Sequence, residues 1–117
     1  MRGMTAYIFI IMMIVSLTSF HVPNAFAGTV DYKKIYKNEC QKCHGMDGKG
    51  SKRGKGLGAP DFTDADWQAS VTDEQLVNSI THGKNKMPKQ EGNLSQEEIK
   101  AVVKYVRFFV PKSKRTY

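Results

Sequence analysis

Cysteine and acidic residues are scarce in this sequence. Its 117 residues contain two Cys, too few for a disulfide-stapled small protein or for a zinc site with four cysteine ligands. Asp and Glu together number 11 against 18 Lys and Arg, which gives a formal net charge of +7 at pH 7. Hydrophobic residues make up 40% and charged residues 25%, and these near-average values exclude wholesale disorder. The length suits a single domain.

Charged side chains are absent between Arg2 and Asp31. Residues 6–17 in this stretch form an apolar run, and an A-x-A pattern, Ala25-Phe26-Ala27, follows it. A positive start, a short apolar core and small residues at a cleavage point are typical of a secretory signal peptide. We therefore expect residues 1–27 to be removed on export. An uncleaved membrane anchor is the alternative, although the run is shorter than the roughly 20 residues that a spanning helix needs.

The mature domain would comprise residues 28–117, in which no segment alternates apolar and polar residues convincingly with a period of two. Its clearest helix begins at a capping box formed by Ser95 and Glu98, and Pro111 stops it. Its apolar positions follow helical spacing: Ile99, Val102, Val103, Val106, Phe109 and Val110. We expect four residues to form a helix–helix core: Tyr36, Val102, Val103 and Val106.

Two further helices are indicated upstream. The middle one begins at Thr72, the first residue of a second capping box, and we expect Gly83 to end it as a left-handed cap. The first covers residues 31–40 and has apolar side chains on one side. A short helical turn is indicated over residues 64–68, whereas the glycine-rich stretch 45–58 is expected to lack regular structure. Together these patterns predict an all-α domain.

Both cysteines lie in the pentapeptide Cys40-Gln41-Lys42-Cys43-His44. This C-x-x-C-H spacing is the attachment motif of c-type haem, because both thiols can add to haem vinyl groups and the adjacent histidine then lies under the iron. Three alternatives are weaker. A redox-active dithiol is expected near a βαβ pattern, which is not seen here. A zinc site needs four ligands, and the mature domain offers only two Cys and two His, of which Cys40, Cys43 and His44 are crowded together. A disulfide between Cys40 and Cys43 would leave His44 without a role.

With this pentapeptide near its start, Met87-Pro88 downstream and an amphipathic closing helix, the chain from Asp31 to Val110 resembles the small class I c-type cytochromes of the bacterial periplasm. The resemblance implies a cytochrome c fold, in which three main helices and their loops wrap around one covalently bound haem and the first and last helices cross. It also implies a methionine opposite the histidine, and one-electron transfer without catalysis.

The mature domain keeps two methionines, Met46 and Met87. Met46 follows His44 by two residues, so its short tether keeps it near the same haem face. Met87 lies far downstream in a polar, Lys-rich loop, where a buried apolar role is hard to explain. We therefore predict His44 and Met87 as the two iron ligands, a combination that raises the reduction potential. His82 is the other candidate, although its place at a helix end favours a histidine stabilised by the helix dipole.

Two more haem-binding residues are assigned by the resemblance. Pro60 is similar to the family proline whose backbone carbonyl accepts a hydrogen bond from the proximal histidine, and the alternative is an ordinary loop proline. Trp67 is similar to the aromatic residues that donate a hydrogen bond to a haem propionate, and the alternative is a buried core tryptophan.

Basic residues cluster on both sides of the expected ligands. One group follows His44 and the other brackets Met87: Lys49, Lys52, Arg53 and Lys55, and Lys84, Lys86 and Lys89. A positive ring around an exposed haem edge would attract redox partner proteins with acidic docking surfaces. The alternative is a set of solvated lysines that keep the protein soluble. Nucleic acid is not expected as a partner because the chain carries an export signal, and a membrane is expected only if residues 1–27 are retained.

The sequence therefore predicts a monohaem electron carrier in the periplasm and not an enzyme, since no general base, nucleophile or substrate pocket is evident. Two alternatives stay open. The chain could be the c-type haem subunit of a larger redox complex. It could also be a haem-based sensor or ligand-binding module, in which Met87 would leave the iron open to carbon monoxide.

Overall fold

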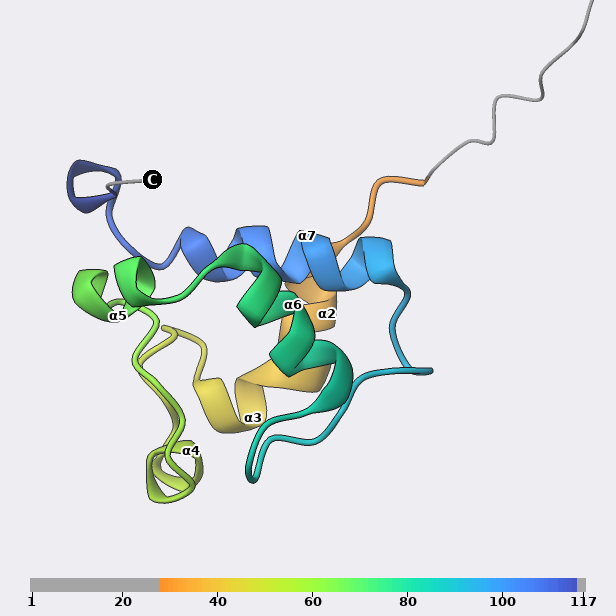
Figure 1. Cartoon of the computed structure of the whole chain (residues 1–117), viewed down its shortest axis with the longest axis horizontal. Coiled ribbons are helices and arrows are strands. Elements are labelled where there is room, and N and C mark those ends of the chain that lie inside the picture. The colour runs from red at the N-terminus through yellow and green to blue at the C-terminus, as the bar shows by residue number, and fades with distance from the viewer. Residues whose placement is uncertain (1–27, 116–117) are drawn as a thin grey trace, which may run out of the picture.

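The computed structural model describes residues 28–115, and the signal peptide expected over residues 1–27 lies outside this part of the chain. The described residues form helices joined by loops (Figure 1). The elements are α2 (Tyr32–Ile35), η2 (Tyr36–Cys40), α3 (Gln41–His44), α4 (Lys52–Gly56), α5 (Ala65–Ser70), α6 (Asp73–His82), α7 (Gln96–Arg107) and η3 (Lys112–Lys114). Two isolated bridges, Lys84 with Met87 and Glu91 with Leu94, are the β features within residues 28–115. The predicted all-α architecture is confirmed.

The first three elements follow one another as a continuous helical segment. It begins where the Asp31 side chain accepts a hydrogen bond from a backbone N–H three residues later, at 3.0 Å. The Gln41 N–H then bonds to the Tyr36 carbonyl five residues earlier, which makes η2 a π-helical turn. The expected end at Cys40 was therefore wrong, because the π turn accommodates an extra residue and the helix continues to His44.

The glycine-rich stretch 45–58 contains a helix, α4, that the sequence pattern did not predict. Ser51 caps it, since its hydroxyl accepts a hydrogen bond from the Gly54 N–H at 3.0 Å. Gly54 is needed for packing, because a Cβ at this position would overlap the Cys43 carbonyl oxygen. The expectation of irregular structure was wrong because part of the glycine content serves this close approach of α4 to α3.

Three later helices begin where the sequence indicates. Asp64 caps α5 close to the turn expected over residues 64–68. Both predicted capping boxes are present, one at the start of α6 and one at the start of α7. In each box the N-cap side chain accepts a hydrogen bond from the backbone N–H three residues later, and the side chain of that later residue accepts one from the N-cap N–H. The pairs are Thr72 with Gln75, and Ser95 with Glu98.

The end of α6 falls at the expected residue but in another conformation, and the end of α7 differs from expectation. Gly83 ends α6 with a positive φ of 79°, but its ψ of 166° lies outside the left-handed helical region, so the expected left-handed cap was wrong and the chain leaves in an extended direction. α7 ends at Arg107, well before Pro111. Beyond it, the Arg115 side chain donates hydrogen bonds to the Val110 and Phe108 carbonyls at 2.8 and 3.2 Å. These bonds replace those that a longer helix would supply.

The core lies where α2 and α7 pack against each other and cross (Figure 1). The four residues predicted to form it are all buried: Tyr36, Val102, Val103 and Val106. The Tyr105 ring of α7 lies 5.3 Å from the Tyr32 ring and 5.2 Å from the Tyr36 ring, measured between centroids. Phe62 and Ile80 extend this cluster towards α5 and α6. Among residues 28–115, no helix has the length and apolar character that crossing a bilayer requires.

Candidate cofactor site

The C-x-x-C-H segment covers the end of η2 and all of α3. Cys40 and Cys43 are both free thiols and are partly exposed. Burial, with a smaller contribution from the Glu39 carboxylate, raises the pKa of the Cys40 thiol to about 11. A reactive dithiol needs a lowered thiol pKa, so these surroundings are unlike those of a redox-active dithiol. Two free thiols at this spacing suit covalent attachment to a haem instead.

The carbonyl groups at the end of α3 are bonded by the loop that follows. Ser51 donates twice, from its hydroxyl to the Lys42 carbonyl at 2.8 Å and from its N–H to the Cys43 carbonyl at 2.9 Å. The Gly50 N–H donates to the His44 carbonyl at 2.9 Å. A helix end usually leaves such carbonyls unpaired. Residues 50–51 therefore fix the backbone of the motif from outside its own helix.

His44 is a buried member of the motif, with 9% of its surface exposed. Its imidazole stacks on the Phe62 ring, with centroids 4.5 Å apart and 16° between the planes. Burial lowers the pKa of the imidazole and so favours the neutral form that coordinates metals. The buried Nδ1 has no hydrogen-bond partner in the part of the chain that the structure describes. A neutral, incompletely bonded imidazole beside two free thiols fits a covalently held haem.

Met87 and Met46 lie in different surroundings. Met87 closes a tight turn, in which its N–H bonds the Lys84 carbonyl at 2.9 Å and its carbonyl accepts the Lys84 N–H at 3.1 Å. Its side chain is partly buried against the core cluster, although the polar sequence around it suggested little apolar contact. Met46 is 70% exposed. His82 is also exposed, and its Nδ1 lies 3.9 Å from a Glu91 oxygen, as befits a histidine at a helix surface.

Pro60 and Trp67 flank Phe62 in the sequence. Because His44 Nδ1 is unbonded, the hydrogen bond expected between it and the Pro60 carbonyl is not formed in this structure. The Trp67 ring packs against Phe62 with centroids 5.4 Å apart, at the border of the core cluster. This packing corresponds to the core-tryptophan alternative, and the contact with a haem propionate stays a prediction.

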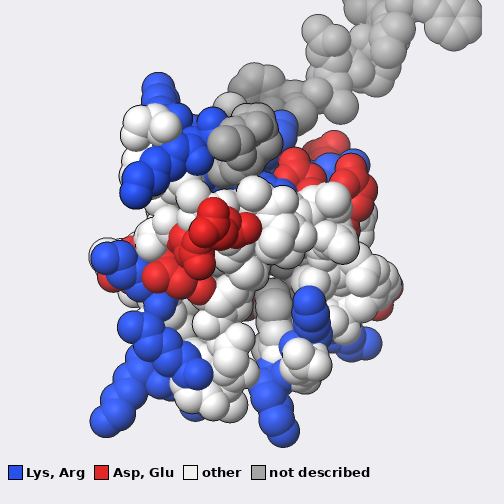
Figure 2. All heavy atoms as spheres, turned by 60° about the vertical axis from the view of Figure 1, so that its left-hand side comes forward, with Lys and Arg blue, Asp and Glu red and all other residues white. Residues whose placement is uncertain are grey.

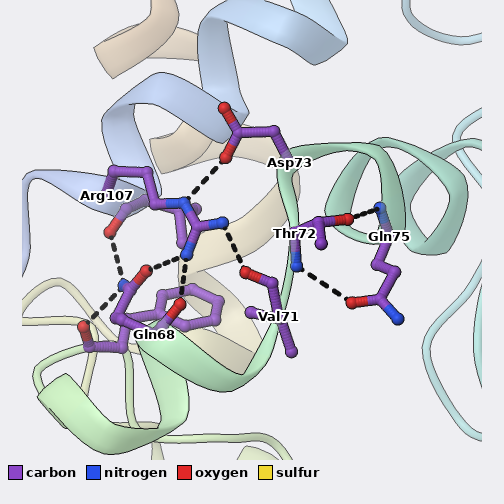
Figure 3. Close-up of polar contacts among 8 residues, drawn as sticks. Gln68, Val71, Thr72, Asp73, Gln75 and Arg107 are labelled. Atoms are coloured by element: carbon purple, nitrogen blue, oxygen red, sulfur yellow. Dashed lines mark hydrogen bonds and ion pairs between the residues drawn. The ribbon is translucent and has the colours of Figure 1, made fainter. Parts of the chain in front are cut away.

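Sequence reasoning missed a buried polar network behind Phe62. Gln68, at 1% exposure, bonds the Phe62 and Val106 carbonyls, and Arg107 bonds Gln68 (Figure 3). A glutamine in a short polar helix gives no pattern that predicts burial, because its partners are backbone carbonyls in distant segments. The side-chain amide of Gln68 thus links the loop carrying Phe62 to α7.

The combination of this helical fold with a partly exposed C-x-x-C segment and a buried histidine is that of a c-type cytochrome domain. A family model described as "Cytochrome C oxidase, cbb3-type, subunit III" matches residues 28–106, and the chain belongs to this family. Haem c, which c-type cytochromes bind covalently, is therefore its cofactor.

Individual relatives agree with this assignment. The chain is 37% identical over 75 residues to the cbb3-type cytochrome c oxidase subunit FixP of Bradyrhizobium diazoefficiens, which covers 63% of this chain and 25% of that protein. It is 30% identical over 92 residues to cytochrome c6 of a Nostoc species, which covers 75% of this chain and 77% of that protein. The chain thus spans about a quarter of the length of the oxidase subunit and most of the length of the small cytochrome.

A solved structure titled "KustC0563 c-type cytochrome" has the same fold. It is 41% identical in sequence, has a TM-score of 0.68, and the match covers 70% of this chain and 100% of that one. The cytochrome c fold predicted from the sequence is confirmed.

Proposed function

We propose that this protein is a monohaem one-electron carrier that works outside the cytoplasm and has no catalytic activity of its own. The observation that carries the proposal is the buried His44, whose lowered pKa favours the neutral imidazole and whose Nδ1 is unbonded, held on the same helical segment as Cys40 and Cys43. Residues 1–27 serve as the signal peptide and residues 28–117 as the cytochrome c domain, which is released into the periplasm.

Four residues hold the haem in this proposal. Cys40 and Cys43 would hold it covalently through thioether bonds, and His44 and Met87 would be its iron ligands. The bound haem supplies a reversible one-electron couple at its iron. The protein supplies a neutral imidazole, a soft thioether that raises the reduction potential, and a fixed backbone around the motif.

Pro60 and Trp67 have supporting roles. When the haem is bound, the Pro60 carbonyl accepts a hydrogen bond from His44 Nδ1, the buried nitrogen that lacks a partner in this structure. The Trp67 indole, which is partly buried beside Phe62, would donate its N–H to a haem propionate.

The test is a spectroscopic analysis of the protein produced with its own leader in a bacterium that matures c-type cytochromes. We expect N-terminal sequencing to begin at Gly28, a pyridine haemochrome assay to give one haem per chain, and the ferric protein to show the near-infrared methionine-to-iron band. The reduced protein should resist carbon monoxide, whereas a sensor module with an open iron site would bind it rapidly. A colourless product with two free thiols would refute the proposal.

Redox partners with acidic surfaces are expected at one end of the molecule. Figure 2 shows Lys and Arg side chains projecting from the lower end, where α4 and the 83–89 segment lie, while the acidic side chains of this view lie higher. The exposed basic residues of these two segments include Lys52, Arg53, Lys55, Lys86 and Lys89. Such a one-signed surface increases the rate of encounter with an acidic partner at low ionic strength.

A second candidate function is that of a haem subunit in a larger redox complex. It is favoured by the match to oxidase subunits, of which this chain covers about a quarter. Purification of the tagged protein from its native membrane and periplasmic fractions would separate the two functions. A free carrier is expected alone in the periplasmic fraction, and a subunit is expected with stoichiometric partner chains.

A further inference from the structure

Phe62 connects the His44 imidazole to the rest of the fold. Its ring stacks on the imidazole at 4.5 Å between centroids. Its backbone is held on both sides, since its N–H donates to the Gly48 carbonyl at 2.8 Å and its carbonyl accepts a hydrogen bond from Gln68 Nε2 at 2.9 Å. The position of the Phe62 ring on His44 therefore depends on whatever holds Gln68.

Gln68 uses both hydrogens of its amide group. Nε2 donates to Phe62 and also to the Val106 carbonyl of α7 at 3.0 Å, while Oε1 accepts from Arg107 Nη1 at 2.8 Å. The side chain is almost completely buried, so a missing partner would leave a desolvated polar group. Because α5 has only six residues, it depends on such contacts for its position.

Arg107 in turn bonds α5 and the segment that follows it. Nη1 donates to the Gln68 carbonyl at 2.7 Å, Nη2 donates to the Val71 carbonyl at 2.7 Å, and Nε pairs with an Asp73 carboxylate oxygen at 2.8 Å (Figure 3). The guanidinium side chain is 13% exposed, whereas that of Asp73 is 61% exposed. The strong, buried part of the network is thus the Gln68–Arg107 pair, and Asp73 lies at its solvent-exposed end.

We propose that Gln68, held by Arg107, is a positioning residue that fixes the orientation of the His44 imidazole through Phe62. The inference rests on the proposed role of His44 as an iron ligand. It adds that the contacts from Gln68 through Phe62 set the plane of the imidazole ring. A stacking partner on one face of an imidazole favours one orientation of the ring, and groups that orient a metal ligand also tune the metal.

Gln68→Glu tests this with little change of volume. The variant keeps an acceptor for Arg107 but loses both amide donors and places a carboxylate oxygen against the Phe62 and Val106 carbonyls. We expect unchanged haem content, altered g-values in the electron paramagnetic resonance spectrum of the ferric protein, and about a tenfold change in the equilibrium constant for electron exchange with a reference couple.

Asp73→Asn is the matched control, because it removes the charge at the exposed end of the network and leaves the buried bonds in place. We expect parental g-values and a parental equilibrium constant. Parental values in Gln68→Glu, together with a lowered stability, would show that the network is only structural and would overturn the proposal. If Gln68→Glu does not fold, Phe62→Leu takes its place, because it removes the stacked ring itself. Unchanged g-values in Phe62→Leu would also overturn the proposal.

The haem-free protein separates this inference from the proposed function. Absence of haem from the parent protein would refute the proposed function alone. In that case the His44 ring resonances are compared by nuclear magnetic resonance, where Gln68→Glu is expected to shift them and Asp73→Asn is not. Equal spectra for both variants would overturn the positioning role.

Discussion

The two methionines of the described chain lie in opposite surroundings: Met87 is partly buried against the core, and Met46 is 70% exposed. We expect Met87→Ala to abolish the near-infrared sulfur-to-iron band and to lower the reduction potential, because the iron would lose its soft axial ligand. Met46→Ala is the control and should leave spectrum and potential unchanged. Optical spectra and a redox titration of both variants check this. A parental band in Met87→Ala would remove Met87 from the ligand set.

Asp61 offers a test of local electrostatics. The Thr63 hydroxyl donates to its carboxylate at 2.6 Å, and this bond is the largest influence that lowers the pKa of Asp61. Burial opposes it, and the Thr63 N–H, Lys49 and Lys55 lower the pKa further. A carboxyl group whose pKa is lower in the folded state contributes stability above its unfolded-state pKa, and that contribution declines as the pH falls through the folded-state value.

Thr63→Val should therefore raise the pKa of Asp61 towards its usual value and make the acid-side loss of stability shallower. Titration of the carboxyl carbon by nuclear magnetic resonance measures the pKa directly. Thr63→Ser keeps the hydroxyl donor and is expected to keep the low pKa. Equal pKa values in the valine and serine variants would contradict the assigned cause.

Single residues differ in how far the sequence reveals their roles. The pentapeptide from Cys40 to His44 is readable because its chemistry depends on spacing alone. Gln68 is not, because its burial is set by the Val106 carbonyl and by Arg107, which lie 38 and 39 positions away. The Phe62 stack on His44 is hidden for the same reason, since only the folded chain brings the two rings together.

At the scale of elements, α4 contains a matched pair of glycines. A Cβ on Gly54 would overlap the Cys43 carbonyl oxygen, whereas one on Gly56 would meet no atom within 4 Å. We expect Gly54→Ala to lower the free energy of unfolding by more than about 3 kcal/mol and to reduce haem incorporation, because backbone must move beside the motif.

Gly56→Ala is expected to be neutral or to stabilise the protein by up to about 1 kcal/mol, as alanine favours helix. Urea unfolding and the yield of haem-containing protein compare the two variants. A similar loss of stability and haem yield in both variants would mean that glycine is not required at position 54 by the close approach of α4 to α3.

The starts of α6 and α7 and the end of α6 at Gly83 could be read from the sequence, whereas α4 and the end of α7 could not. The capping boxes at Thr72 and Ser95 involve residues three apart, so a short pattern contains all of the information. Beyond α7, the Val110 carbonyl accepts a hydrogen bond from the Arg115 side chain. At the start of α4, the hydroxyl of the N-cap residue Ser51 also donates a hydrogen bond to the Lys42 carbonyl in α3. These are contacts between elements, which no local pattern encodes.

At the scale of the whole molecule, the distribution of charge predicts how the protein meets its partners. We expect the double variant Lys84→Glu and Lys86→Glu to transfer electrons about tenfold more slowly to an acidic partner at low salt, with a shallower dependence on ionic strength, because attraction during encounter is lost. Stopped-flow kinetics over a range of salt concentrations measures this.

The control reverses Lys112 and Lys114 in η3, which lies at the opposite end of the molecule from the 83–89 segment (Figure 1). It changes the net charge equally, so it should alter the rate much less. Equal effects of the two double variants would indicate a response to net charge without a docking surface. The sequence indicated two basic clusters around the expected ligands, and the fold places α4 and the 83–89 segment at the same end of the molecule.

The π-helical turn from Tyr36 to Cys40 has a consequence for insertions and deletions in this molecule. Deleting one residue here would convert the turn to regular α-helix and keep the Tyr36 face and the motif in their present relative orientation, because a π turn takes up one extra residue within a single turn. A deletion in α2, which has no extra residue to lose, would instead rotate everything that follows by about 100° relative to the chain before it. The segment between the packed aromatic and the first thiol should therefore tolerate the loss of one residue better than the regular helix before it does.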